Sequence, residues 1–126
     1  MLHHFSFAVT DLNRSAAFYD AALGALGYVR AWQDKTAVGY GPQYGVETFA
    51  IREQKPGMHV QGAGLHVAFS AASRPAVDAF YEAAIKAGGT DNGGAGLHQE
   101  FGADYYAAFV IDPDGYRIEA VVAGDF

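Results

Sequence analysis

Residues 4–23 read HFSFAVTDLNRSAAFYDAAL, and residues 66–85 read HVAFSAASRPAVDAFYEAAI. When the chain is shifted by the 62 positions that separate His4 from His66, the two stretches align without a gap. In that single register Phe18-Tyr19 falls on Phe80-Tyr81. Both the residue types and the intervening length are preserved, which chance rarely achieves together. We interpret the sequence as a tandem duplication.

Each copy predicts a strand followed by a helix. Phe5, Phe7 and Val9 alternate with small or polar residues, the pattern of a half-buried strand. Apolar residues at spacings of three and four then predict a helix over 12–26, with Asp11 as its N-cap. The second copy repeats these signals. Ser73 is the predicted N-cap, Pro75 lies in the first turn, and Gly88-Gly89 ends the helix.

The segments after each helix are rich in aromatic and β-branched residues and predict further strands. These cover 28–32, 37–40 and 46–53 in the first copy, and 97–101, 105–111 and 116–122 in the second. The glycine-rich stretch 57–64 is the expected joint. The predicted fold class is therefore α+β, a single domain of two tandem βαβββ modules spanning residues 1–57 and 64–126.

Composition narrows the classes of function. The chain has 14 acidic against eight basic side chains and a formal charge of −6, so a nucleic acid backbone would be repelled. It contains no cysteine, so a metal could be bound only by His, Asp, Glu or Tyr. The sequence offers no apolar run of the roughly 20 residues that a membrane helix needs. The first six residues lack the pattern of a secretory signal, so we expect a cytoplasmic protein with no membrane partner.

Three stretches carry a resemblance to a known family: HFSFAVTDL at 4–12, LHVAF at 65–69 and DPDGYRIE at 112–119. In this order they resemble the vicinal oxygen chelate superfamily, which holds glyoxalases, extradiol dioxygenases and bleomycin-resistance proteins. The resemblance implies that the curved sheets of the two modules join into an open, cup-like β-barrel. The helices would lie outside this barrel and a ligand pocket inside it.

The resemblance also implies a metal site, because metal-using members take their ligands from the first and last strands of each module. His4 and His66 match the two first-strand positions, and Glu119 matches the last-strand position of the second module. The remaining position falls near Phe49, which cannot bind a metal. Glu47 or Glu53 could supply the fourth ligand through a register shift. Without such a fourth ligand, the metal site would have three protein ligands.

Two imidazoles and one carboxylate suit a divalent cation, and Fe, Mn, Zn and Ni all remain candidates. A substrate with two neighbouring oxygens could bind at the free coordination positions. Each of the three residues taken alone is more simply a hydrogen-bonded or exposed strand residue. Their coincidence at three family positions favours a metal site.

Other residues have candidate roles beside the metal. Glu119 itself is a candidate catalytic group. Arg117 shares a strand face with Glu119 and could orient it or hold an anionic substrate, although a salt bridge at the rim is an equal alternative. Tyr105 and Tyr106 point to opposite faces, and we assign the catalytic role to Tyr106. His98 is either a solvated loop residue or an acid–base group near the pocket.

The leading hypothesis is a metal-dependent glyoxalase-like lyase or isomerase, or a dioxygenase, acting on a small molecule. The alternative is a non-catalytic protein that binds a drug or metabolite, as bleomycin-resistance relatives do. A third possibility is a degenerate member of the family that is retained only as a scaffold. Exposed strand edges and family precedent predict a homodimer.

Overall fold

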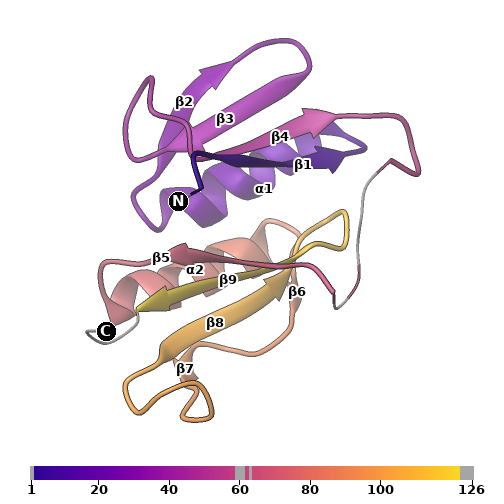
Figure 1. Ribbon diagram of the computed structural model, residues 1–126. Coiled ribbons are helices and arrows are strands. Elements are labelled where there is room, and N and C mark those ends of the chain that lie inside the picture. The colour runs from indigo at the N-terminus through magenta and orange to yellow at the C-terminus, as the bar shows by residue number, and fades with distance from the viewer. Residues whose placement is uncertain (1, 59–61, 63, 123–126) are drawn as a thin grey trace.

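The computed structural model describes residues 2–58, 62 and 64–122 (Figure 1). The N-terminal half contains β1 (Phe5–Val9), α1 (Leu12–Gly24), β2 (Val29–Gln33), β3 (Ala37–Gly41) and β4 (Phe49–Glu53). The C-terminal half contains β5 (His66–Ser70), α2 (Arg74–Lys86), β6 (Thr90–Asp91), β7 (Gly96–Leu97), β8 (Tyr106–Ile111) and β9 (Arg117–Val122). No helix in these described ranges is long and apolar enough to cross a membrane.

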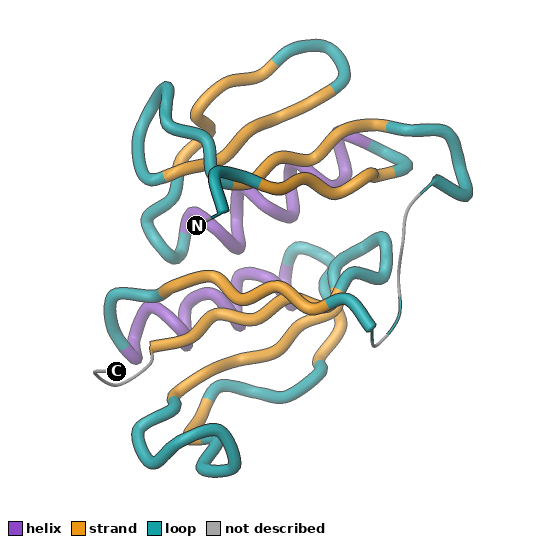
Figure 2. The backbone as a smooth tube through the Cα atoms, viewed as in Figure 1, coloured by secondary structure: helices purple, strands orange, loops and turns teal. Residues whose placement is uncertain are grey.

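The strands form two sheets, which Figure 2 shows one above the other. The first has the order β1-β4-β3-β2, and the second has the order β5-β9-β8-β6 with β7 also paired to β8. In each half the first strand lies parallel to the last strand, β1 beside β4 and β5 beside β9. The α+β class is confirmed, whereas the duplication itself stays a prediction.

The expected joint barrel is not present. Among the described residues no strand of one sheet pairs with a strand of the other. Aromatic side chains occupy the seam instead: the ring centroids of Phe5 and Phe69 are 6.4 Å apart, and those of Phe49 and Phe69 are 5.3 Å apart. At this seam the two sheets meet through side-chain packing and not through a shared hydrogen-bond ladder.

Both helices begin at the predicted caps. The Asp11 side chain accepts from the Arg14 backbone N–H at 3.1 Å, and the Ser73 hydroxyl accepts from the Ala76 N–H at 3.3 Å. Helix α1 ends at Gly24 rather than at residue 26, because the chain turns there and the Tyr28 N–H bonds the Leu23 carbonyl. Gly27, with φ +88°, provides the left-handed backbone of this turn.

Two predicted strands are shorter than expected. The segment predicted at 97–101 is reduced to β7, because the Phe101 N–H turns back to the His98 carbonyl at 3.0 Å. The strand predicted from residue 46 begins only at Phe49, since the Val46 N–H closes a turn on the Gln43 carbonyl. Residues 59–61 and 63 of the predicted joint lie outside the described residues.

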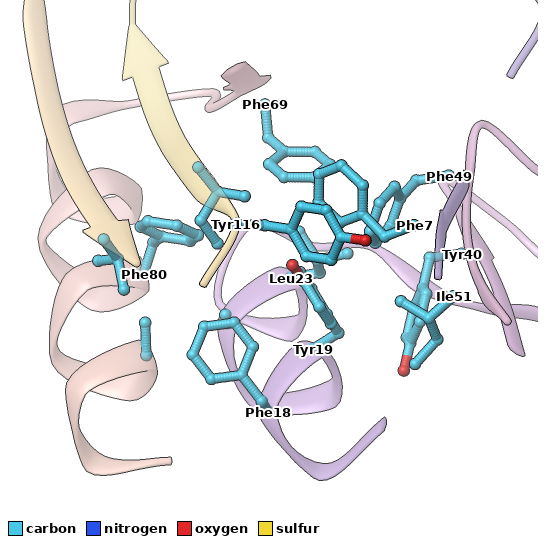
Figure 3. Packing of buried hydrophobic residues seen from close by; sticks show 14 of the residues in the cluster. Phe7, Phe18, Tyr19, Leu23, Tyr40, Phe49, Ile51, Phe69, Phe80 and Tyr116 are labelled. Carbon is cyan, nitrogen blue, oxygen red and sulfur yellow. The ribbon is translucent and has the colours of Figure 1, made fainter. Parts of the chain in front are cut away.

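One hydrophobic core serves both halves of the chain (Figure 3). The Phe7 ring of β1 stacks on the Tyr116 ring of the C-terminal half, with centroids 3.9 Å apart. Helices α1 and α2 contact each other, α1 also packs on β4, and α2 packs on β8 and β9. The helix-covered sheet faces therefore share one interior, and the opposite faces remain open.

The turn Asp112-Pro113-Asp114-Gly115 fastens the two halves together. Asp114 accepts from the Thr10 hydroxyl at 2.9 Å, from Arg14 Nη2 at 3.0 Å and from the buried Ser15 hydroxyl at 2.9 Å. Asp112 accepts from the Tyr19 hydroxyl, and burial raises the pKa of this carboxyl group. Part of the motif that carried the family resemblance is therefore a structural clamp.

Candidate functional site

His66 and Glu119 are brought together on the open face of the second sheet. In the parallel ladder Ala68 lies opposite Glu119, so His66, two residues earlier on β5, shares that face. His66 Nε2 lies 2.5 Å from Glu119 Oε1. The imidazole side chain is 40% exposed and the carboxylate side chain only 4%. The pair therefore consists of an accessible imidazole backed by a buried carboxylate.

Tyr105 completes this arrangement. Its hydroxyl donates to Glu119 Oε2 at 2.5 Å, so each carboxylate oxygen has its own partner. Burial, with help from the bond to Glu119, raises the pKa of Tyr105 to about 12, so the phenol keeps its proton at neutral pH. Tyr106 is not brought to this site, because its hydroxyl donates to Asp78 of α2 on the helix-covered face.

His4 has a different partner, Glu47. His4 Nε2 lies 3.8 Å from Glu47 Oε2, at the edge of the first sheet. Glu47 precedes β4, and its Oε1 accepts from the Trp32 indole N–H at 2.7 Å. Glu53, the other carboxylate considered for this position, instead accepts from the Leu12 N–H at the start of α1. Of the two, only Glu47 reaches a predicted ligand.

The last-strand position in the N-terminal half is Ala50 rather than Phe49. Ser6, the counterpart of Ala68, pairs with Ala50, whereas Phe49 pairs with Phe5 and is buried in the core. The sequence comparison was one residue out of register, and one residue turns a strand side chain to the other face. Neither the alanine nor the phenylalanine side chain can bind a metal, and the carboxylate nearest to His4 is that of Glu47 in the preceding loop.

Trp32 is the residue of this site that the sequence analysis missed. A register shift between Arg30 and Trp32 places Trp32 opposite Gly39. A Cβ atom on Gly39 would lie 2.2 Å from the indole nitrogen, so the ring needs glycine beneath it. Arg52 covers the ring, with its guanidinium carbon 5.5 Å from the ring centroid. That Trp32 is the chain's single tryptophan was the available signal, whereas its pairing with Gly39 follows from the register shift in the structure.

The predicted triad is not assembled within the described chain. Across residues 2–58, 62 and 64–122, no group of three or more His, Asp or Glu side chains could hold one metal ion. The two predicted histidine ligands instead form separate imidazole–carboxylate pairs, His4–Glu47 and His66–Glu119. Each pair has an aromatic hydrogen-bond donor on the carboxylate.

Two further candidates lie beside the second pair. Arg117 is the ladder neighbour of His66 and forms no ion pair with Glu119 among the described residues. His98 packs edge-on against Phe109 with centroids 4.9 Å apart, and the same ring lies 5.8 Å from His66. His98 is therefore close to the open face, where its Nδ1 lies 3.5 Å from Glu100 Oε1.

A cavity of about 230 Å³ opens at the seam between the halves. Its walls are mainly aromatic, and His3, His4, Thr48 and Ser70 supply polar groups. The Tyr28 hydroxyl bridges the seam by donating to the Ser70 carbonyl at 3.0 Å. The volume is below the roughly 300–1,000 Å³ of pockets for drug-sized ligands, so it suits a smaller molecule.

Comparisons with known proteins agree with this architecture. The family model described as "Glyoxalase/Bleomycin resistance protein/Dioxygenase superfamily" matches residues 1–120. A glyoxalase/bleomycin resistance protein from Albidiferax ferrireducens is 33% identical, with a TM-score of 0.81 over 96% of this chain and 97% of that one. A glyoxalase-related enzyme from Fulvimarina pelagi is 20% identical, with a TM-score of 0.73 over 96% and 86%, and shows the fold alone. None of the curated proteins compared with the chain matches it.

Proposed function

Because the chain belongs to the glyoxalase/bleomycin resistance protein/dioxygenase superfamily, we propose that it is a metal-dependent enzyme acting on a small molecule with two neighbouring oxygens. The observation that carries the proposal is the His66–Glu119 pair, in which a nearly buried carboxylate lies 2.5 Å from an accessible imidazole. Burying a carboxylate is costly, and here His66 and the Tyr105 hydroxyl provide its hydrogen-bond partners. A functional site is the simplest reason to keep it there.

The available donors fit a divalent cation. Imidazole nitrogens and carboxylate oxygens suit Zn, Mn, Fe and Ni. His66 and Glu119 would supply one half of the ligand set, and His4 with Glu47 the other half. When bound, the metal would act as a Lewis acid that stabilises negative charge on the substrate oxygens. Of the chemistries of the family, we propose a glyoxalase-like isomerase or lyase.

We propose that the two halves of the site meet between two copies of the chain in a homodimer. Each pair provides too few ligands alone, and each is flanked by exposed apolar side chains. Tyr44 (84% exposed) and Val46 precede Glu47, and Phe101 (59% exposed) packs against Tyr105. Exposed apolar side chains of this size are available for burial in an interface. A second copy would bury them and bring the pairs together.

The chain's own residues would then position the substrate. His4 lines the seam cavity, so a substrate whose apolar body occupies the cavity could present its oxygens to the imidazole. Thr48 and Ser70 line the same cavity with hydroxyl groups that can donate to those oxygens. Arg117, beside His66 in the ladder, would hold an anionic group of the substrate.

The test combines elemental analysis with subunit mixing. Protein purified without chelator should contain about one divalent metal per chain. The His4→Ala and His66→Ala homodimers should each lose this metal. Both histidines are exposed, so the circular dichroism spectra of the two variants should match that of wild-type protein. A mixed dimer of the two variants should recover one metal per dimer, because one of its two sites keeps both histidines. If the mixed dimer contained no metal, the site would not lie between chains. If wild-type protein bound neither Zn²⁺ nor Ni²⁺ when these ions were added, the proposal of a metal-dependent enzyme would be contradicted.

The second candidate function is metal-independent binding of a drug or metabolite. The observation that favours it is the seam cavity, whose aromatic walls can hold a flat apolar ligand within one chain. The two functions differ in their dependence on the carboxylates. Binding in the cavity should survive Glu119→Gln, whereas a metal-dependent reaction should not.

A further inference from the structure

The inner wall of the seam cavity is apolar and comes from both halves of the chain. Leu23, Tyr40 and Phe49 of the N-terminal half meet Phe69 of the C-terminal half there. These four side chains are buried (Figure 3), and the Phe49 and Phe69 rings pack edge to face with centroids 5.3 Å apart. Among the described residues that line the cavity there is no Asp, Glu, Lys or Arg. A molecule inside it would therefore meet no carboxylate, ammonium or guanidinium group.

Two hydroxyl groups, one from each half, lie at the mouth of the cavity. Thr48 and Ser70 both line it and are both exposed. Within the part of the chain that the structure describes, neither hydroxyl has a hydrogen-bond partner in the protein. The Ser70 carbonyl, in contrast, accepts from the Tyr28 hydroxyl. A hydroxyl can both donate and accept, so the two groups suit the hydroxyl or carbonyl oxygen of a ligand.

We propose that the seam cavity binds an uncharged molecule made of one aromatic ring with a hydroxyl or carbonyl substituent. The inference rests on the second candidate function, the binding of a drug or metabolite, and names its ligand class. An apolar cavity of about 150 Å³ can hold benzene. The volume of about 230 Å³ therefore accommodates one ring and a short substituent. The aromatic wall offers edge and face contacts to that ring.

The charge of the ligand follows from the same wall. A charged group that leaves water without a partner of opposite charge loses much of its solvation free energy. Arg117, Glu47 and Glu119, which could pair with such a group, do not line the cavity. Binding in the cavity therefore disfavours anions and cations alike and does not involve the carboxylates of the two imidazole–carboxylate pairs.

The experiment compares three ligands that each have one ring, one carbon substituent and a different charge: benzyl alcohol, benzoate and benzylammonium. Each is titrated into the full chain at neutral pH, and the amide signals of Phe69 and Ser70 are followed by NMR. Benzyl alcohol should shift these signals, and the two charged ligands should bind more than about tenfold more weakly. Because the ligand contacts both halves of the folded chain, benzyl alcohol should also raise the urea midpoint of unfolding. Added EDTA should leave its affinity unchanged.

Four variants locate the ligand. Thr48→Val and Ser70→Ala each remove one hydroxyl and should weaken the binding of benzyl alcohol by about 2–10-fold. Thr90→Val is the matched control, because Thr90 is exposed on β6 and does not line the cavity, and it should bind as wild-type protein does. Ser70→Leu places a branched side chain in the mouth and should abolish binding. Equal affinities for wild-type and Ser70→Leu protein would place the ligand elsewhere and overturn the inference.

The comparison of ligands separates this inference from the function on which it rests. If benzoate or benzylammonium shifted the Phe69 and Ser70 signals as strongly as benzyl alcohol, the uncharged ligand class would be wrong, while the binding of a small molecule would stand. If none of the three ligands shifted these signals, the cavity would not be a ligand site, and the second candidate function would fail with it.

Discussion

The two halves of the candidate site place their carboxylates by different routes. In the C-terminal half Glu119 lies within β9, opposite Ala68 in the ladder, and approaches His66 to 2.5 Å. At the same ladder position the N-terminal half has Ala50 opposite Ser6. Its carboxylate comes from Glu47 in the preceding loop and lies 3.8 Å from His4. A strand carboxylate is thus positioned by the sheet, whereas a loop carboxylate depends on its side-chain partners.

This difference explains why the donors matter unequally to the two pairs. The Glu119 side chain is nearly buried and has its strand, His66 and Tyr105 to fix it. The Glu47 side chain is 17% exposed and is held chiefly by Trp32. We therefore expect the Glu119 carboxylate to be held more firmly than the Glu47 carboxylate.

The largest effect should come from removing the two carboxylates in turn. Glu119→Gln keeps the side-chain volume and removes the charge, so metal affinity should fall by more than the roughly 10–100-fold expected for an outer partner. Glu47→Gln should cost less, because the loop carboxylate is the looser of the two. Chelator competition on both variants tests this order.

Glu82→Gln is the matched control, because Glu82 lies on the exposed side of α2, and it should bind metal as wild-type protein does. An equal or greater loss for Glu47→Gln would reverse the ranking of the two half-sites.

A smaller effect should follow from loosening the clamp between the halves. Asp114→Ala leaves the fully buried Ser15 hydroxyl without its acceptor, and an unsatisfied buried group costs about 1–3 kcal/mol. The free energy of unfolding in urea should fall by that amount. Asp104→Ala at an exposed position should change it by less than about 0.5 kcal/mol.

Metal binding should change little in Asp114→Ala, because His66 and Glu119 lie on one sheet and are held by their own ladder. If the clamp variant lost metal as completely as Glu119→Gln, the position of this pair would depend on the clamp.

Much of the fold could be predicted because its signals are local. The caps Asp11 and Ser73 and the alternation of Phe5, Phe7 and Val9 act within a few residues, and each appears in the structure. The absence of a joint barrel could not be predicted, because it depends on how the two sheets meet across the seam, where the Phe5 and Phe49 rings pack against Phe69. That packing brings together residues far apart in the chain.

The candidate site was predicted in part for the same reason. His66 and Glu119 meet because the spacing of residues along a strand fixes the face of each side chain. The assignment of Phe49 was wrong by one residue, because the loop before β4 differs from the turn before β9 and sequence alone did not fix the register. Tyr105 rather than Tyr106 faces Glu119, and this choice depended on where β8 lies relative to α2.

The smallest predicted effect is on the pH dependence of stability, and it concerns two exposed turns, one in each half, that are each held by an aspartate. Asp34 accepts from the Thr36 N–H at 2.8 Å, and Asp91 accepts from the Gly93 N–H at 3.0 Å. These backbone hydrogen bonds lower the pKa of each carboxyl group below its ordinary value of 3.8.

A lowered pKa means that the folded chain binds the proton less readily than the unfolded chain. The resulting stability is present above pH 3.8 and is lost as the pH falls through the folded-state values. Carboxyl titration by NMR should give both aspartates pKa values below 3.8, and a value at or above 3.8 for either one would show that its turn is not held by the charged carboxylate.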